Sequence, residues 1–196
     1  MTAAGIEHVG LPWGRPLSYE DFEALRESVD DGHRYELIDG VLIVSPSPIH
    51  VHQRAVGNVY VALRASVPDE LEVLLAPFDV VFLGETATVM QPDLLVAARG
   101  DIMRRNLPSA PLLAIEVLSP STRSFDLHLK KDRLRRAGCA HYWVVDPAAP
   151  SVVAWRLVGA GESAVYELVG EAVDDEVLSV DEPFAITVVP RALVER

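Results

Sequence analysis

Three charged residues lie in or beside segments that otherwise indicate a buried core, and their types suit metal-assisted chemistry. Asp93 precedes the apolar residues 94–96, and Glu116 lies within the apolar run 112–118. An ionised carboxylate in such a place is costly unless it is paired or binds a metal. Two hard oxygen ligands on neighbouring strands favour Mg²⁺ or Mn²⁺. With Lys130 nearby, they supply the groups that metal-assisted phosphodiester hydrolysis requires.

The two carboxylates differ in how strongly their surroundings indicate a site. Asp93 follows Pro92, which cannot donate a ladder hydrogen bond and therefore marks the start of a strand. Asp93 taken alone also fits a turn residue. Glu116 lies in the middle of a predicted central strand, where an isolated glutamate is typical of a paired or functional group.

Lys130 is placed by helical geometry. At about 100° per residue, it lies within about 30° of the centre of the apolar face that Leu127, Leu134 and Ala137 define. We therefore expect Lys130 to face the sheet and to pair with Glu116 or with a substrate phosphate. The alternative is a side chain that extends along the apolar surface to solvent.

The pattern of elements that would position these residues is a mixture of helices and strands. Three helices are expected over 19–29, 50–65 and 124–137. Strands are expected over 34–39, 41–45, 71–76, 78–83, 93–97, 112–118, 141–146, 152–157, 164–169 and 184–188. The Asp39-Gly40 pair predicts a hairpin turn. Strands separated by helices predict an α/β fold in which helices pack on a central mixed sheet.

Composition indicates one ordinary soluble domain. The chain has 196 residues, of which 49% are hydrophobic and 23% charged. Residues 1–17 are expected to form a flexible N-terminal arm, and residues 18–196 a single domain with a short C-terminal strand extension. No apolar run approaches the roughly 20 residues of a membrane span, and the start lacks the pattern of a secretory signal. The single cysteine, Cys139, excludes an internal disulfide and favours a reducing compartment, so we expect a cytoplasmic protein.

The net charge of −12 opposes simple binding to nucleic acid. Its distribution is uneven, because residues 99–136 contain nine Lys and Arg against four Asp and Glu, a local balance of +5. The remainder of the chain therefore carries −17. The basic stretch is either a surface that faces a substrate or an ordinary solvated helix face.

Short motifs in the right order extend this interpretation to a family. They are Tyr35-Glu36-Leu37-Ile38-Asp39-Gly40, Ser45-Pro46-Ser47-Pro48, His52-Gln53, Gln91-Pro92-Asp93, residues 116–122, Asp126 with Lys130, and residues 138–147. Over residues 19–157 the chain resembles the Uma-two family of endonucleases, a branch of the PD-(D/E)XK nuclease superfamily. The resemblance implies a restriction-endonuclease-like fold, a central mixed sheet flanked by helices.

The resemblance also implies roles for individual residues. Asp93 and Glu116 match the metal-binding acids, and the carbonyl of Val117 would add a further metal ligand. The superfamily usually carries its lysine two residues after the glutamate, where this chain has Leu118. Lys130, on the following helix, matches the lysine as this branch places it.

Glu36 and His52 are second to these, and Leu134 departs from the family pattern. Leu134 stands where many relatives carry a tyrosine, a departure that affects the support of the site. Glu36 matches a further acid at the metal site, although it also fits an exposed strand glutamate. His52 matches a family histidine that contacts the substrate or orients Glu36, whereas His50 is expected to be solvated or to cap the helix.

These observations lead to a metal-dependent endonuclease that uses Mg²⁺ or Mn²⁺ and acts on nucleic acid, with DNA as the expected substrate. The alternative is a catalytically silent binding or assembly module with the same fold. A homodimer is expected, because the mean hydropathy is +0.20 and the tail alternates apolar residues over 184–189. The alternative is a monomer whose tail covers its own sheet.

Overall fold

A six-stranded mixed sheet forms the centre of the protein. The computed structural model describes residues 14–120 and 123–195. The strand order is β11-β10-β9-β8-β6-β3, with only β8 and β9 parallel among these neighbours. The bounds are β3 (Leu71–Leu75), β6 (Leu94–Ala98), β8 (Leu113–Val117), β9 (His141–Asp146), β10 (Ser151–Val158) and β11 (Val165–Val173). All five residues of β8 are buried, as expected of a central strand covered on both faces.

Two smaller sheets accompany it. The five-stranded sheet has the order β2-β1-β5-β4-β7, with bounds β1 (Arg34–Ile38), β2 (Val41–Ser45), β4 (Asp79–Phe82), β5 (Thr88–Met90) and β7 (Asn106–Leu107). β12 (Leu178–Val180) pairs with β13 (Ile186–Val188). Leu95 and Ala97 of β6 pack against Val80 of β4 and Leu107 of β7, so the two larger sheets share a core.

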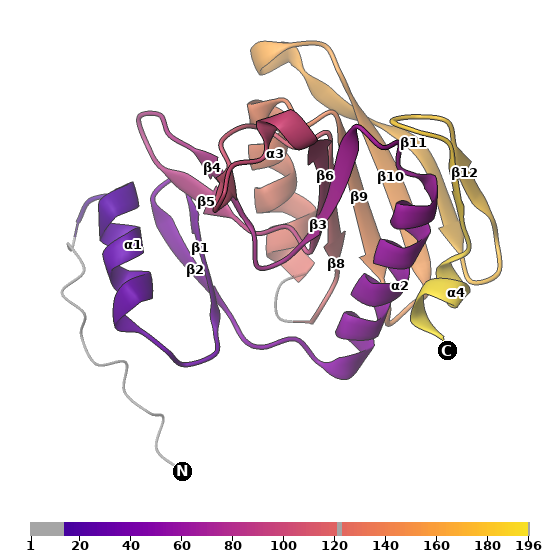
Figure 1. Ribbon diagram of the computed structural model, residues 1–196, viewed down its shortest axis with the longest axis horizontal. Coiled ribbons are helices and arrows are strands. Elements are labelled where there is room, and N and C mark those ends of the chain that lie inside the picture. The colour runs from indigo at the N-terminus through magenta and orange to yellow at the C-terminus, as the bar shows by residue number, and fades with distance from the viewer. Residues whose placement is uncertain (1–13, 121–122, 196) are drawn as a thin grey trace.

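Helices cover both faces of the six-stranded sheet (Figure 1). The described α-helices are α1 (Tyr19–Ser28), which packs on the five-stranded sheet through Phe22, and α2 (His50–Ser66), α3 (Lys131–Ala137) and α4 (Pro190–Val194). A π-helix η2 (Phe125–Lys130) precedes α3, and there are 3₁₀ turns η1 (Arg99–Asp101) and η3 (Gly161–Ser163). Leu63 of α2 packs with Ile115 of β8, whereas Leu134 of α3 packs with Ala114. Because neighbouring strand residues point to opposite faces, α2 and α3 lie on opposite sides of the sheet.

The hairpin that carries Glu36 follows directly from its turn residues. Asp39 and Gly40 both have positive φ, 49° and 79°, which is the conformation of a two-residue hairpin turn. The register pairs Glu36 with Ile43 across the hairpin. Glu36 and Ile38 share one face of β1, and Leu37 packs on the other face in the cluster that contains Phe22 of α1.

The predicted α/β fold is confirmed, with a second large sheet that the sequence pattern did not indicate. β5, β7, β12 and α4 were not predicted, because elements of two to five residues are too short to establish a periodic pattern. The predicted helix over 124–137 is present, and its first half, Phe125–Lys130, is π-helical. These wide turns carry two buried charged residues, Asp126 and Lys130, toward the sheet, and such turns frequently occur at functional sites.

The described parts of the two chain ends differ from the predicted flexible arm and exposed tail. Residues 1–13 of the predicted arm lie outside the described residues, but Leu17 is buried and its N–H donates to the carbonyl of Gly40 at 2.9 Å. The predicted arm therefore does not extend to Leu17. Ile186 and Val188 of the tail are buried in the main core, so the surface invoked for dimerisation is covered by this chain itself. The homodimer and the single-domain assignment remain predictions.

None of the described helices is both long enough and apolar enough to cross a membrane.

Candidate active site

Asp93 and Glu116 lie opposite each other at the end of two neighbouring strands. β6 and β8 are antiparallel, and Leu94 pairs with Ile115, so the same register sets Asp93 beside Glu116. Directly opposed residues of an antiparallel pair point to the same face. The backbone N–H of Val117 donates to Asp93 Oδ2 at 2.9 Å and fixes this carboxylate against β8. Both side chains are buried, and the structure thus brings together the two predicted metal-binding acids.

Lys130 lies among three carboxylates. Its Nζ is 3.0 Å from Glu36 Oε2, 3.3 Å from Glu116 Oε1 and 3.3 Å from Asp126 Oδ1. All four side chains are at most 1% exposed. Lys130 is therefore buried and paired with Glu116 as predicted, and it does not extend to solvent.

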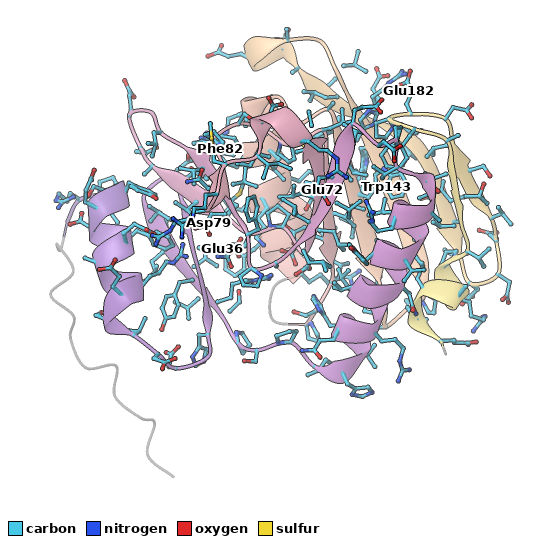
Figure 2. The ribbon with its side chains drawn as sticks, in the orientation of Figure 1. Glu36, Glu72, Asp79, Phe82, Trp143 and Glu182 are labelled. Atoms are coloured by element: carbon cyan, nitrogen blue, oxygen red, sulfur yellow. The ribbon has the colours of Figure 1, made fainter. Side chains whose placement is uncertain are left out.

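Glu36 is a buried member of this cluster and not an exposed strand residue. Besides its contact with Lys130, its Oε1 accepts the backbone N–H of Gln91 at 2.7 Å. The Gln91 side chain donates in turn to Asp79 Oδ1 at 2.7 Å, and Arg26 pairs with Asp79 at 2.8 Å. Figure 2 shows Glu36 and Asp79 near each other on the side of the protein that carries α1 and the β1–β2 hairpin.

Two basic side chains also contact the Asp93 carboxylate. Arg34 Nη1 donates to Asp93 Oδ1 at 2.8 Å, and His52 Nε2 lies 3.2 Å from Asp93 Oδ2. His52 was expected to contact a substrate or to orient Glu36, and its partner in the structure is Asp93. His50, two residues earlier on the same helix, is exposed, as expected.

Sequence reasoning missed Arg34 and gave Asp126 no role in the site. Arg34 precedes Glu36 by two residues on β1, and residues two apart in a strand share a face, so period-two alternation could have identified it. Asp126 lies four residues before Lys130, a spacing at which helical side chains meet. Its segment is also fixed by Tyr142, whose hydroxyl donates to the Asp126 carbonyl at 2.6 Å.

The buried cluster contains more acids than bases. Glu36, Asp93, Glu116 and Asp126 face the two permanent cations Arg34 and Lys130. Burial raises the pKa of Glu116 well above its ordinary value, and the neighbouring Asp126, Asp93 and Glu36 add to this against the opposing effect of Lys130. The cluster therefore favours an additional positive charge beside Glu116.

The pKa values of Asp93 and Lys130 are shifted in the direction that favours the charged form of each group. Burial alone would raise the pKa of Asp93, but the His52 hydrogen bond and the Arg34 and Lys130 charges hold it well below its usual range. Burial likewise opposes the charged form of Lys130, yet Glu116, Glu36 and Asp126 raise the pKa of the ammonium group. Asp93 is therefore a carboxylate and Lys130 an ammonium ion throughout the neutral pH range.

A cleft of about 950 Å³ opens onto this cluster. Asp93, Arg34 and His52 line it, together with parts of the β1–β2 hairpin, the first turns of α2 and the segment after β3. Glu36, Glu116 and Lys130 are not among its lining residues. Of the four acids in the cluster, Asp93 is thus the one that lines the cleft, and the other three are buried beside it.

Apart from the buried Lys130, the basic residues of the stretch 99–136 lie outside the lining of the cleft. From this stretch Ser119 and Pro120 line the cleft, but none of its lysines or arginines does. Arg123 pairs with Asp146, Arg133 and Arg136 pair with Asp39, and Arg135 pairs with Asp132. The interpretation of this stretch as a substrate-facing patch is therefore not supported by its position.

Leu118 and Leu134, the two departures from the family pattern, are both core residues. Leu118 follows β8 and Leu134 lies on α3, and both pack in the cluster that contains Tyr142 and Cys139. Leu134 has no exposed surface. The end of the glutamate-bearing strand is therefore apolar, and the lysine reaches Glu116 from the helix instead.

The donor set at the site fits a hard divalent cation. Asp93 and Glu116 supply carboxylate oxygens on adjacent strands, and Glu116 Oε2 is buried without a hydrogen-bond partner among the described residues. Within the described chain, no three His, Cys, Asp or Glu side chains are arranged to hold a metal ion. Because Mg²⁺ commonly binds through one or two carboxylates and keeps several waters, two protein acids suffice for such a site.

Comparisons with known proteins agree with this architecture. Residues 19–190 match the model of the family Uma2, described as “Putative restriction endonuclease”. The crystal structure of a “putative nuclease” from Anabaena variabilis ATCC 29413 is similar in fold, with a TM-score of 0.66 at 20% sequence identity. The similarity covers 91% of this chain and 98% of that one. A search of curated proteins gives no match.

The fold is that of the nuclease-like mixed α/β proteins, in which helices flank a mixed sheet. The chain belongs to the Uma2 family.

Proposed function

We propose that this protein is a metal-dependent endonuclease that hydrolyses phosphodiester bonds of nucleic acid, with DNA as the expected substrate. The observation that carries the proposal is the pair Asp93 and Glu116, opposed on adjacent strands at a cleft, with the buried Glu116 Oε2 lacking a hydrogen-bond partner among the described residues. Family membership supports the reaction class.

Asp93, Glu116 and the carbonyl of Val117 would hold Mg²⁺ or Mn²⁺. The bound ion would lower the pKa of a coordinated water and stabilise charge that develops on the phosphate. Asp93 presents its carboxylate to the cleft, where Arg34 and His52 keep it ionised and oriented.

The remaining buried residues act on Glu116. Lys130, a permanent cation, holds Glu116 Oε1, which leaves Glu116 Oε2 as the oxygen available for the metal. Glu36 and Asp126 fix the position of the Lys130 ammonium group at 3.0 and 3.3 Å. In this arrangement Lys130 positions Glu116 and offsets negative charge when a phosphate enters.

The test is a Glu116→Gln variant, which keeps the shape of the side chain and removes its charge. We expect wild-type protein to bind Mn²⁺ in calorimetric titrations and to cleave DNA in its presence, and Glu116→Gln to lose both. Glu72→Gln is the matched control, because Glu72 lies on β3 and pairs with Arg99 at the surface. Undiminished cleavage by Glu116→Gln would refute the assignment.

A catalytically silent binding or assembly module is the second candidate. It is favoured by the three contacts of Lys130, which already compensate much of the acidic charge that a metal would neutralise. A module of this kind need bind no metal. Mn²⁺ titration of wild-type protein and Asp93→Ala distinguishes the two, since only an active centre requires binding that disappears in the variant.

A further inference from the structure

The charge of the cleft is unlike that of a surface that binds a nucleic-acid duplex. Of the residues that line it, only Arg26 and Arg34 carry a permanent positive charge, and no lysine does. Arg26 is paired with Asp79 and Arg34 with Asp93, each at 2.8 Å. Affinity for duplex DNA comes largely from Lys and Arg that neutralise many phosphates. Two arginines that are already paired with carboxylates can neutralise few phosphates at most.

Acidic residues at the same cleft add to this effect. Asp30 and Asp31 line it and are exposed. They would repel a second strand that carried its phosphates past the opening. The cleft therefore favours a ligand that brings few phosphates to it.

Apolar side chains form much of the wall. Ile49, at the start of α2, lines the cleft and is 61% exposed, although an isoleucine gains nothing from contact with water. Val56, Leu75 and Pro77 line it as well. The half-buried ring of Tyr35 is a further lining group. Apolar and aromatic groups of this kind contact the faces of unpaired bases, which are hidden in a duplex.

The size of the cleft sets the length of the ligand. Its volume of about 950 Å³ is in the range that encloses a ligand of small-molecule size, equivalent to a few nucleotides. Proteins that read a duplex instead spread roughly 1,000–2,500 Å² of basic surface over it.

We propose that the cleft receives a short single-stranded segment of nucleic acid, whose unpaired bases contact Ile49 and Tyr35 while one phosphodiester reaches Asp93. This inference rests on the proposed function, since it names the substrate class of the same centre. It concerns binding, which can be measured without cleavage.

The experiment measures fluorescence anisotropy of labelled probes with the Glu116→Gln protein, which should bind without cutting. The probes are a five-nucleotide DNA strand, the same strand as RNA, and a 16-base-pair DNA duplex. We expect at least one single strand to bind about tenfold or more tightly than the duplex. Equal or tighter binding of the duplex, or binding of no probe, would overturn the inference.

Salt dependence provides an independent readout. With at most two phosphates neutralised, affinity for the single strand should fall no more than about tenfold between 50 and 200 mM salt, whereas a protein with six to ten phosphate contacts loses roughly 10³ to 10⁵. A loss in that larger range contradicts the inference whichever probe binds better.

The variant pair Ile49→Ala and Val61→Ala tests the site itself. Both residues are exposed, 61% and 67%, and Val61 lies on α2 away from the cleft. Ile49→Ala should weaken single-strand binding about three- to tenfold, and Val61→Ala less than about twofold. Equal effects of the two would overturn the inference, and a urea unfolding curve for each checks that folding is intact. If wild-type protein cleaves nothing while these binding results hold, only the proposed catalysis fails.

Discussion

Replacing Lys130 with methionine is the most informative perturbation of the buried cluster. Methionine keeps most of the length and apolar stem of the side chain and removes the ammonium group. The three carboxylates at 3.0–3.3 Å from Nζ would then share only Arg34 as a permanent cation, and its Nε is 3.9 Å from Glu36 Oε2.

The expected loss of stability is large because the cluster is closed to water. Removing one partner of a buried ion pair costs about 3–5 kcal/mol, since it leaves an uncompensated buried charge. The raised pKa of Lys130 means that its contribution is fully present below the ordinary lysine pKa of 10.5 and is lost only as the pH rises through the folded value. At pH 7 we therefore expect the full loss, and at pH 5 a smaller one, because the carboxylates become protonated more readily in the variant.

Urea unfolding followed by circular dichroism at pH 7 and pH 5 measures this effect. Lys131→Met is the matched control, because the Lys131 ammonium group lies 3.3 Å from the centre of the Trp155 ring, whereas the three carboxylates of the cluster pair with Lys130. The control should lose about 0.5–1 kcal/mol. A loss below about 1 kcal/mol for Lys130→Met at pH 7, or a loss that grows toward pH 5, would refute the electrostatic account of the site.

Two further predictions concern regions outside the cluster. Burial raises the pKa of Cys139 to about 12, so the native thiol should resist Ellman's reagent at pH 8 and react only on unfolding. Native labelling as fast as in denaturant would contradict this. Gly40→Ala should destabilise by about 1–2 kcal/mol, because φ is 79° and a Cβ would lie 2.3 Å from that of Pro16. Gly57→Ala, in open space on α2, should stabilise by about 0.5–1 kcal/mol, and thermal unfolding that ranks the two in reverse order would refute the comparison.

The sequence predicted the elements whose patterns are long or strongly marked. α2 and β9 were expected at nearly their observed bounds, because sixteen or so residues of helical periodicity and an uninterrupted apolar run are clear signals. The hairpin of β1 and β2 followed from Asp39-Gly40. β7, with two residues, has no period to detect, and its partner β4 lies more than twenty residues earlier in the chain.

The candidate site was predicted in its members more fully than in its contacts. Burial of Asp93, Glu116 and Lys130 could be expected from the apolar residues around them. The contact between His52 and Asp93 could not, because it depends on where the first turn of α2 lies relative to β6, which no local pattern specifies. The π-helical turns of η2 could not be predicted either, since the same residues have ordinary helical periodicity in the sequence.

The distribution of the cluster along the chain has a consequence for how the candidate site is assembled. Glu36, Asp93, Glu116 and Lys130 come from β1, the start of β6, β8 and η2, so the centre joins segments from the first strand of the described chain to the helix after β8. Contacts between distant segments form late, because a long loop must close before they gain anything. We expect a chain still in synthesis that ends before Lys130 to hold the acids without their ammonium partner. The proposed catalytic centre would then be complete only in a chain that extends at least as far as Lys130.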